Sequence, residues 1–394
     1  MSTKGLALVT GANGFIGART VEAFLEAGFS VRAATRSASS AAGLLAALPQ
    51  YAKTDQLSTV QVPDITVAGA FDEAVRDVSA VAHLASAVSL SNTNVDYVIN
   101  SAVKGTASIL ASALAQPTIK SFVFMSSIVA VRGRGEKYIG RTVSEADWND
   151  EAEEALAQAG SNAAGHQIYV VSKVKAERAF WEFRKANADK IGFSMTAVNP
   201  VWVAGPPLIL PEDPEKLSDT AIIAYRIMAG QEVSPAGPGN GTHVDVRDVA
   251  RLVIFAAEHR HAADGERFIA GGNGNYANVQ AYADVLRREY PERRGVILKG
   301  KPGEGYNADY SEPVAARGVD ASKAVKATGQ DWIPFERMLL DAAKAYESTS
   351  NVIRNISQEM RYTPRGVNDS SAYRRAADGP RCLGHPWPDP NPID

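Results

Sequence analysis

A glycine-rich turn near the amino terminus constrains the fold more than any other feature. The segment TGANGFIG holds Gly11, Gly14 and Gly17 between the apolar run LALVT and the helical pattern ARTVEAFLEAG. Glycine permits a tight turn at the first position, close approach of the backbone to a pyrophosphate at the second, and packing of helix on strand at the third. This context predicts a nucleotide-binding unit, although the spacing departs from G-x-G-x-x-G and a purely structural turn is the alternative.

Short apolar runs alternate with helical patterns along the first two hundred residues. Several of these runs are apolar at consecutive positions, which indicates strands covered on both faces. The alternation predicts an α/β fold with a Rossmann-type, doubly wound parallel sheet. The runs that we expect to be strands are 6–10, 30–34, 59–63, 80–85, 121–126 and 194–199.

The composition of the chain changes after Pro200, where prolines and glycines become frequent between helical patterns. We therefore expect a smaller C-terminal substrate-binding lobe. The last sixteen residues hold five of the twenty prolines, which is typical of an irregular tail. The predicted parts are an NADP-binding Rossmann domain at 1–200, a substrate lobe at 201–345 that is interleaved with it, and a Pro-rich tail at 346–394.

Charge and cysteine content exclude several classes of partner. The 394 residues include 41 basic and 44 acidic side chains, so there is no excess positive charge for nucleic acid or an anionic membrane. No apolar stretch approaches the length of a membrane span. The single cysteine, Cys382, fits a reducing compartment, and we expect a cytoplasmic protein. Six histidines and one cysteine show no metal-ligand spacing, so we expect no metal.

The second expected strand indicates which dinucleotide binds. Units that bind NAD usually carry an acid at the end of this strand, whereas an arginine there accommodates the 2′-phosphate of NADP. Here the strand ends at Arg36 and is followed by Ser37, Ser39 and Ser40. A guanidinium beside hydroxyl groups suits a dianionic phosphate. We therefore predict NADP(H), with Arg32 as a second and weaker candidate for the same contact.

A tyrosine and a lysine four residues apart predict the chemistry. In YVVSK, the side chains of Tyr169 and Lys173 share one face of a helix, and a nearby ammonium is expected to lower the pKa of the tyrosine. Such a pair suits a general acid that protonates a carbonyl oxygen. An exposed helix face with unrelated side chains is the alternative. Ser126 and Ser127 end the fifth strand, where ligands of such sheets bind.

These motifs, in this order, resemble the extended short-chain dehydrogenase/reductases. The segments VRAATRSAS, VAHLASAVSLSN, SEADWN and GQEVSPA are more closely similar to the fungal aldehyde reductase and ketoreductase branch, neighbours of dihydroflavonol reductase. The resemblance covers about residues 5–345. It implies that Ser127 binds the substrate carbonyl, Tyr169 donates the proton, and Lys173 binds the nicotinamide ribose and tunes Tyr169.

The glycine turn, Arg36 and the resemblance together indicate the cofactor-binding residues. In family members, the segment after the third strand flanks the adenine, LAS passes the cofactor by its backbone, and PVWV lies against the nicotinamide. The expected NADP(H)-binding residues are Gly11, Asn13, Gly14, Phe15, Ile16, Gly17, Arg36, Asp64, Ile65, Leu84, Ala85, Ser86, Tyr169, Lys173, Pro200, Val201, Trp202 and Val203.

Two departures limit what the resemblance implies. Many extended members have Asn in an N-V-x-G-T stretch, whereas this chain has Ala102 there, which puts a proton relay through that position in doubt. Dihydroflavonol reductases have Asn where this chain has Arg132, so flavonoid reduction is disfavoured. We expect the substrate cleft to be walled by residues such as Val88, Trp202, Leu208, Leu210, Tyr225 and Met228, with His166 nearby.

Other polar residues are assigned structural roles. His83 lies in an apolar strand and is expected to be packed, and Asp245 and Asp248 are expected at a helix start. Trp148 is matched in the family without an evident role. The sequence thus predicts hydride transfer from NADPH to a small-molecule aldehyde or ketone. The alternatives are a nucleotide-sugar epimerase or dehydratase on the same fold and a non-enzymatic NADP-sensing regulator, and the oligomeric state is left open.

Overall fold

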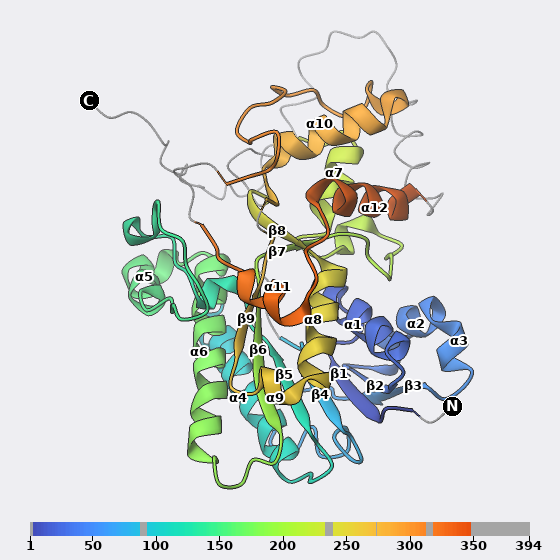
Figure 1. The fold of residues 1–394 in the computed structure, drawn as a ribbon, viewed down its shortest axis with the longest axis vertical. Helices are drawn as coiled ribbons and strands as arrows, with labels where there is room; N and C mark the ends of the chain where they lie inside the picture. The colour runs from blue at the N-terminus through green and yellow to red at the C-terminus, as the bar shows by residue number, and fades with distance from the viewer. Residues whose placement is uncertain (1–2, 87–92, 233–238, 273, 313–317, 348–394) are drawn as a thin grey trace.

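A seven-stranded sheet forms the body of the molecule in the computed structural model, which describes residues 3–86, 93–232, 239–272, 274–312 and 318–347 (Figure 1). The strand order is β3-β2-β1-β4-β5-β6-β9, and every neighbouring pair is parallel. The strands are Leu6–Thr10 (β1), Ser30–Thr35 (β2), Leu57–Gln61 (β3), Ala80–His83 (β4), Ser121–Met125 (β5), Ser194–Pro200 (β6) and Arg267–Ala270 (β9).

Successive residues of the central strands β1, β4 and β5 enter separate apolar cores on the two faces of the sheet. In β1, Ala7 and Val9 pack in one core together with residues of helices α1 (Phe15–Glu26) and α8 (Val246–Glu258). Leu8 points to the opposite core, which contains residues of α4 (Val95–Leu114) and α6 (Gly165–Ala186). Because the strands are buried on both faces, they read as continuous apolar runs. The predicted Rossmann-type, doubly wound sheet is confirmed.

All six runs predicted as strands overlap strands of this sheet. The seventh strand, β9, is four residues long and begins at Arg267, so it offers no apolar run that stands out in the sequence. It pairs with β6 from Ala197↔Arg267 to Pro200↔Ala270. The chain therefore returns to the large sheet well after Pro200.

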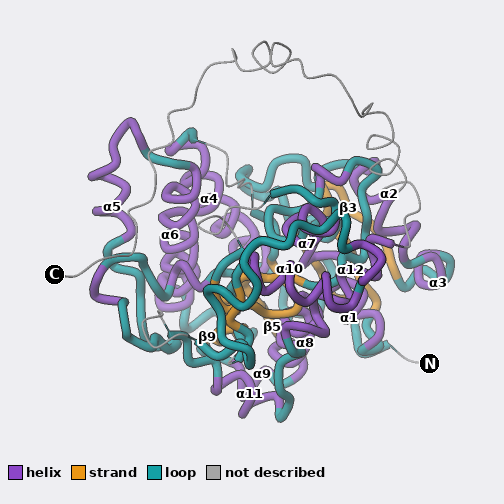
Figure 2. Tube along the Cα trace, turned by 90° about the horizontal axis from the view of Figure 1, so that it is seen from above, coloured by secondary structure: helices purple, strands orange, loops and turns teal. Residues whose placement is uncertain are grey.

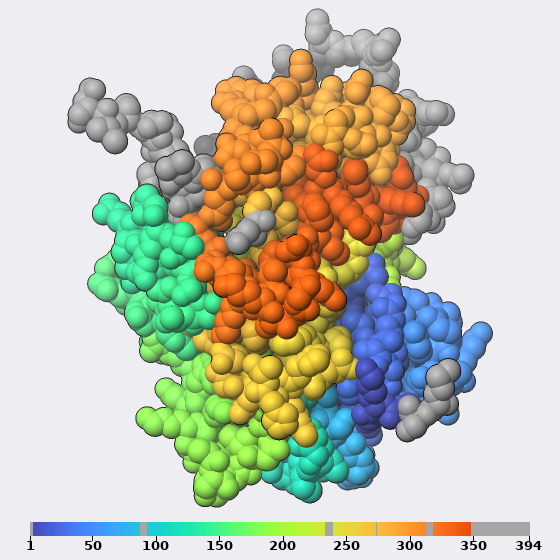
Figure 3. Space-filling model, in the orientation of Figure 1, coloured from blue at the N-terminus to red at the C-terminus, as the bar shows by residue number. Residues whose placement is uncertain are grey.

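A smaller lobe lies above the carboxyl ends of the large sheet in Figure 1. Its three-stranded sheet has the order β10-β8-β7, formed by Tyr276–Ala277 (β10), Gly241–Asp245 (β8) and Trp202–Ala204 (β7). Helices Ile222–Met228 (α7), Val279–Glu289 (α10) and Phe335–Glu347 (α12) pack in its separate core. Figure 3 shows the orange and red segments of this lobe gathered in the upper half of the molecule.

The remaining helices lie around the sheet. Figure 2 shows α5 beside α6 and α4 at one edge, and α2 with α3 at the opposite edge. Their bounds are Ala38–Ala47 (α2), Pro49–Ala52 (α3), Ala152–Ala159 (α5), Arg260–Ala263 (α9) and Ser322–Thr328 (α11). The short 3-10 helices are Ile128–Ala130 (η1), Glu136–Tyr138 (η2), Gly160–Asn162 (η3), Pro214–Lys216 (η4) and Pro291–Arg293 (η5). Among the described helices, none has both the length and the apolar composition of a membrane span.

Candidate active site and cofactor cavity

The glycine turn joins β1 to α1 and leaves no room for a side chain at Gly11 or Gly17. Gly11 has φ +66°, and a Cβ there would lie 3.0 Å from the backbone nitrogen of Ala85. A Cβ at Gly17 would lie 2.0 Å from the carbonyl oxygen of Gly11, so this glycine allows helix and turn to touch. Gly14 is the N-cap of α1, and no side chain caps the helix there. The amide groups of the first turn are therefore left for an anionic ligand, as phosphate sites require.

A cavity of about 970 Å³ runs from this turn along the carboxyl ends of β1, β2 and β4 and the segment after β3. Half of the predicted cofactor-binding positions line it. These are Gly11, Asn13, Gly14, Arg36, Asp64, Ile65, Leu84, Ala85 and Ser86. The other predicted positions do not line it. Gly17 packs inside the turn, Phe15 and Ile16 pack against the core under α1, and 200–203 join β6 to β7.

Thr10 ties the ends of β1 and β4 together at the base of this cavity, a role that sequence reasoning missed. Its hydroxyl oxygen accepts hydrogen bonds from the backbone nitrogens of Leu84 and Ala85, both at 3.0 Å. It also contacts Nδ1 of His83 at 2.8 Å. His83 is 2% exposed, and burial lowers its pKa to about 3. His83 is thus packed, as predicted, and its lowered pKa keeps it neutral.

Arg36 stands at the mouth of the cavity beside the start of α2. It is exposed, and Ser37 caps α2 by accepting a hydrogen bond from the backbone nitrogen of Ser40 at 3.3 Å. The Ser37 hydroxyl also lies 3.0 Å from that of Ser39. Arg32 is held elsewhere, because its Nη1 donates to the carbonyl oxygens at 74 and 76 at 2.9 and 2.7 Å. Of the two arginines, Arg36 is therefore the one whose side chain lines the cavity.

The first half of α4 supplies a polar wall of the cavity that we did not predict. The residues of this wall recur three and four positions apart, and this pattern could have predicted a polar helix face from the sequence. Ala102 itself is buried against the core, while its neighbour Ser101 lines the cavity. The wall consists of Asn94, Asp96, Tyr97, Asn100, Ser101 and Lys104.

Ser127, Tyr169 and Lys173 meet at the carboxyl end of β5. Ser127 follows the strand as the N-cap of η1, and its hydroxyl hydrogen-bonds with the side chain of Tyr169. Lys173 lies one turn after Tyr169 on α6, with Nζ 6.0 Å from the centre of the tyrosine ring. The Lys173 ammonium donates to the carbonyl oxygen of Met125 at 3.2 Å. The fold thus brings together the three residues that the sequence singled out.

The electrostatics of this group differ from the prediction for Tyr169. Burial raises the pKa of Tyr169, opposed by its hydrogen bond with Ser127, whereas we predicted that the nearby ammonium would lower it. The prediction was wrong because burial disfavours the phenolate more than the hydrogen bond with Ser127 favours it. Burial also lowers the pKa of Lys173 to about 8, opposed by the charge of Glu177. Tyr169 therefore carries its proton at neutral pH.

Other residues considered in the sequence are explained by packing and capping. Asp245 caps α8 by accepting from the backbone nitrogen of Arg247 at 2.8 Å, as predicted. Asp248 lies in the first turn of α8. Tyr225 and Met228 are buried in the core of the small lobe, so packing accounts for them. Val88 lies outside the described residues.

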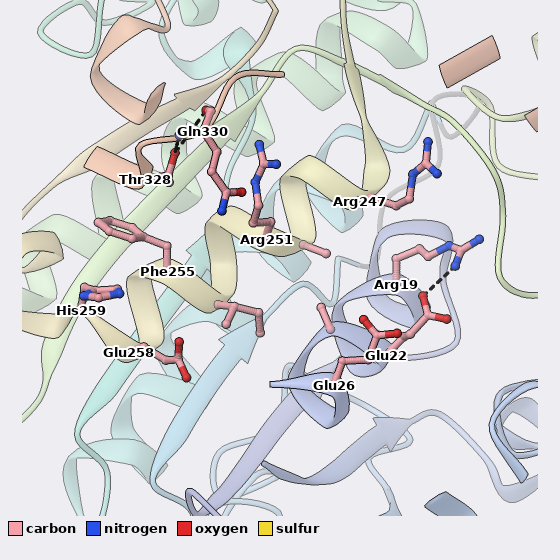
Figure 4. A pocket seen from close by; sticks show the side chains of 13 residues that line it. Arg19, Glu22, Glu26, Arg247, Arg251, Phe255, Glu258, His259, Thr328 and Gln330 are labelled. Atoms are coloured by element: carbon pink, nitrogen blue, oxygen red, sulfur yellow. Dashed lines mark hydrogen bonds and ion pairs between the residues drawn. The ribbon is translucent and has the colours of Figure 1, made fainter. Parts of the chain in front are cut away.

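A second hollow of about 540 Å³ lies between α1 and α8 (Figure 4). Two of its arginines form ion pairs: Arg19 with Glu22 at 2.6 Å, and Arg247 with Asp245 at 2.7 Å. Figure 4 shows the Arg19–Glu22 pair on α1 facing the arginines of α8 across the hollow. It contains none of the residues predicted to bind cofactor or substrate.

Known proteins share both the sequence pattern and the fold. The model of the NAD dependent epimerase/dehydratase family matches residues 7–271. The NADPH-dependent methylglyoxal reductase GRE2 of Saccharomyces cerevisiae is 31% identical over 75% of this chain and 86% of its own length. Aldehyde reductase 2 of Sporidiobolus salmonicolor is 36% identical over 59% of this chain and 66% of its own length.

A solved structure extends this similarity to both lobes. The crystal structure of yeast methylglyoxal/isovaleraldehyde reductase Gre2 complexed with NADPH matches with a TM-score of 0.73 at 27% identity. The match covers 90% of this chain and 99% of that chain.

Proposed function

The chain belongs to the NAD dependent epimerase/dehydratase family, and we propose that it is a reductase of this family that uses NADPH to convert an aldehyde or ketone to an alcohol. The observation that carries the proposal is the convergence of Ser127, Tyr169 and Lys173 at the end of β5, the strand next to the cofactor cavity. The reductases to which the chain is similar support the same reaction class and cofactor.

The cavity fits a dinucleotide that carries a 2′-phosphate. The turn leaves little room for a Cβ at Gly11, and Gly14 presents the uncapped start of α1, which suits a pyrophosphate. Asp64 and Ile65 line the cavity and, in this proposal, would flank the adenine. Arg36 and the serines at the start of α2 provide a charge and hydroxyl donors for the extra phosphate. When bound, NADPH supplies the hydride for the reaction.

The residues at the end of β5 handle the oxygen of the substrate. The hydroxyl groups of Ser127 and Tyr169 donate hydrogen bonds to the carbonyl oxygen and stabilise the negative charge that develops there. Tyr169 then gives its proton to that oxygen, acting as general acid. Because burial raises its pKa, the phenol is protonated and ready at neutral pH. The Lys173 ammonium stabilises the phenolate that results.

The test of this function is an NADPH oxidation assay with a panel of aldehydes, diketones and β-keto esters. The fall in NADPH absorbance measures the reaction with each compound. A reductase releases NADP⁺ in proportion to the alcohol formed. An epimerase or dehydratase would act on a nucleotide sugar with no net release of oxidised cofactor, and a regulator would bind NADPH without turnover with any member of the panel. The single cysteine is consistent with our proposal that the reaction takes place in the cytoplasm.

A further inference from the structure

A buried carboxylate that the mechanism does not use lies beside the catalytic group. Glu177 follows Lys173 on α6 at the same spacing at which Lys173 follows Tyr169, so the three side chains share one face of the helix. Its side chain is 0% exposed. A fully buried carboxylate is costly unless it is paired and hydrogen-bonded, so its partners show what it is for.

One oxygen of Glu177 holds the segment that carries the catalytic serine. Oε2 accepts from the hydroxyl of Ser126 at 2.5 Å and from Nδ2 of Asn199 at 2.7 Å. The same Nδ2 donates to the backbone carbonyl oxygen of Ser127 at 3.2 Å. The carbonyl oxygen of the preceding residue, Met125, accepts from Lys173. Three consecutive residues at the end of β5 are thus held by one cluster of buried polar groups.

The other oxygen anchors this cluster to a buried arginine. Oε1 accepts from Nε of Arg267 at 2.6 Å and from Nε1 of Trp181 at 3.3 Å. Nη1 of Arg267 donates to the carbonyl oxygens of residues 145 and 147, at 2.8 and 2.6 Å, and its guanidinium lies 4.0 Å from the ring centre of Trp148. Arg267 is 8% exposed, so the ion pair is shielded from solvent. This packing gives Trp148 a role as the support of Arg267.

We propose that Glu177 is a positioning residue for the reduction, which holds the Ser126–Ser127 segment in place and presents a fixed negative charge to the ammonium of Lys173. The inference rests on the proposed function, because it acts through Ser127 and Lys173. Substitution of Glu177 should therefore alter turnover and its pH dependence, and not only stability.

Glu177 is the main charged neighbour of the Lys173 ammonium. It raises the pKa of Lys173 against the effect of burial. The other ionisable groups that interact with Lys173 are His83 from β4, which burial keeps neutral, and Tyr169 on α6. Arg267 from β9 pairs with Glu177 itself. Removal of the carboxylate charge should therefore lower the pKa of Lys173.

Two single hydrogen-bond deletions test the positioning without changing any charge. Ser126→Ala removes the direct hydrogen bond between the serine segment and Oε2 of Glu177. Trp181→Phe removes a hydrogen bond to the other oxygen, Oε1, which does not contact the serine segment. We expect Ser126→Ala to lower kcat at least about tenfold with little change in the KM for NADPH, since a hydrogen bond to a charged group is lost. Trp181→Phe should keep kcat. Equal kcat values for the two variants would overturn the positioning role.

Glu177→Gln and Glu177→Asp separate charge from geometry. In Glu177→Gln, the alkaline limb of kcat/KM should move to lower pH by at least about one unit, because the protonated form of Lys173 loses its counter-charge. Glu177→Asp keeps the charge but shortens the side chain. Its alkaline limb of kcat/KM should stay at the wild-type pH, while its kcat should be low. An unmoved limb in Glu177→Gln would overturn the electrostatic part.

Controls separate this inference from the proposed function and from misfolding. If the wild-type protein reduces no carbonyl, the proposed function fails before any variant is compared. Each variant is also assayed for its melting temperature and for NADPH affinity across the same pH range. If Glu177→Gln does not fold, the Ser126→Ala and Trp181→Phe pair decides the positioning role. The alkaline limb of kcat/KM in Glu177→Asp, which keeps the charge, should then stay at its wild-type pH, and a displaced limb would overturn the electrostatic part.

Discussion

Replacement of Arg36 should reverse the choice of cofactor. Its guanidinium is the charged group that lines the cavity beside the start of α2. A hydrogen bond to a charged group contributes about 1.5–3 kcal/mol, so Arg36→Ala should weaken NADPH binding about ten- to a hundredfold. Arg36→Asp adds repulsion of about 1 kcal/mol even in water at contact distance, a further fivefold or so. NADH, which lacks the 2′-phosphate, should bind as before or better.

The assay is a pair of titrations, NADPH and NADH, of each variant followed by nicotinamide fluorescence. Arg32→Ala is the matched control on the same strand. The Arg32 guanidinium donates to backbone carbonyls of a neighbouring segment, so this change should lower the melting temperature and leave the ratio of the two affinities unchanged. If Arg36→Asp leaves the ratio at its wild-type value, or Arg32→Ala changes it, the assignment of the phosphate contact is wrong.

Three further predictions concern the site and its stability. Lys173→Met should weaken NADPH binding and lower kcat together while keeping or raising the melting temperature, because burial already disfavours the Lys173 charge and lowers its pKa; a lower melting temperature would contradict this. Gly17→Ala should abolish cofactor binding or folding, since its Cβ would lie 2.0 Å from the oxygen of Gly11; dinucleotide titration and circular dichroism check it. His83 in β4 and His243, which is fully buried in β8, have pKa values lowered by burial to about 3 and about 4. The unfolded chain therefore binds their protons first as pH falls below 6.5. Each histidine should therefore lower the free energy of unfolding by about 1.4 kcal/mol per pH unit between pH 6.5 and about pH 4. A free energy of unfolding in urea that does not change over this range would contradict the prediction.

Features encoded in a short stretch of sequence were predictable. The glycine turn, the strand–helix alternation and the spacing of Tyr169 and Lys173 each lie within one or two elements, so their local geometry follows from the residues themselves. The pair Ser126 and Ser127 was expected near Tyr169 because parallel strands place their carboxyl ends at one edge of the sheet, and the family resemblance singled out Ser127. Arg36 was separated from Arg32 by its place at the end of β2, and the structure gives Arg32 backbone partners instead.

Features that depend on which elements meet were not predictable in this way. β9 is too short to stand out, yet it brings Arg267 to Glu177, ninety residues earlier in the chain. Asn199 gains its role only because β6 lies beside β5. The pKa of Tyr169 was predicted in the wrong direction because the effect of Lys173 was inferred from spacing, whereas desolvation depends on the packing around the ring.

The central claim is that Tyr169 gives the proton to the substrate oxygen, and Tyr169→Phe tests it most directly. Phenylalanine keeps the ring and its packing but lacks the hydroxyl. With the carbonyl substrate that the wild-type protein reduces fastest, kcat should fall about 10²- to 10⁴-fold, the usual contribution of general acid catalysis, while NADPH affinity and melting temperature stay near wild type. Near-normal kcat in Tyr169→Phe, with NADPH bound as before, would contradict the assignment.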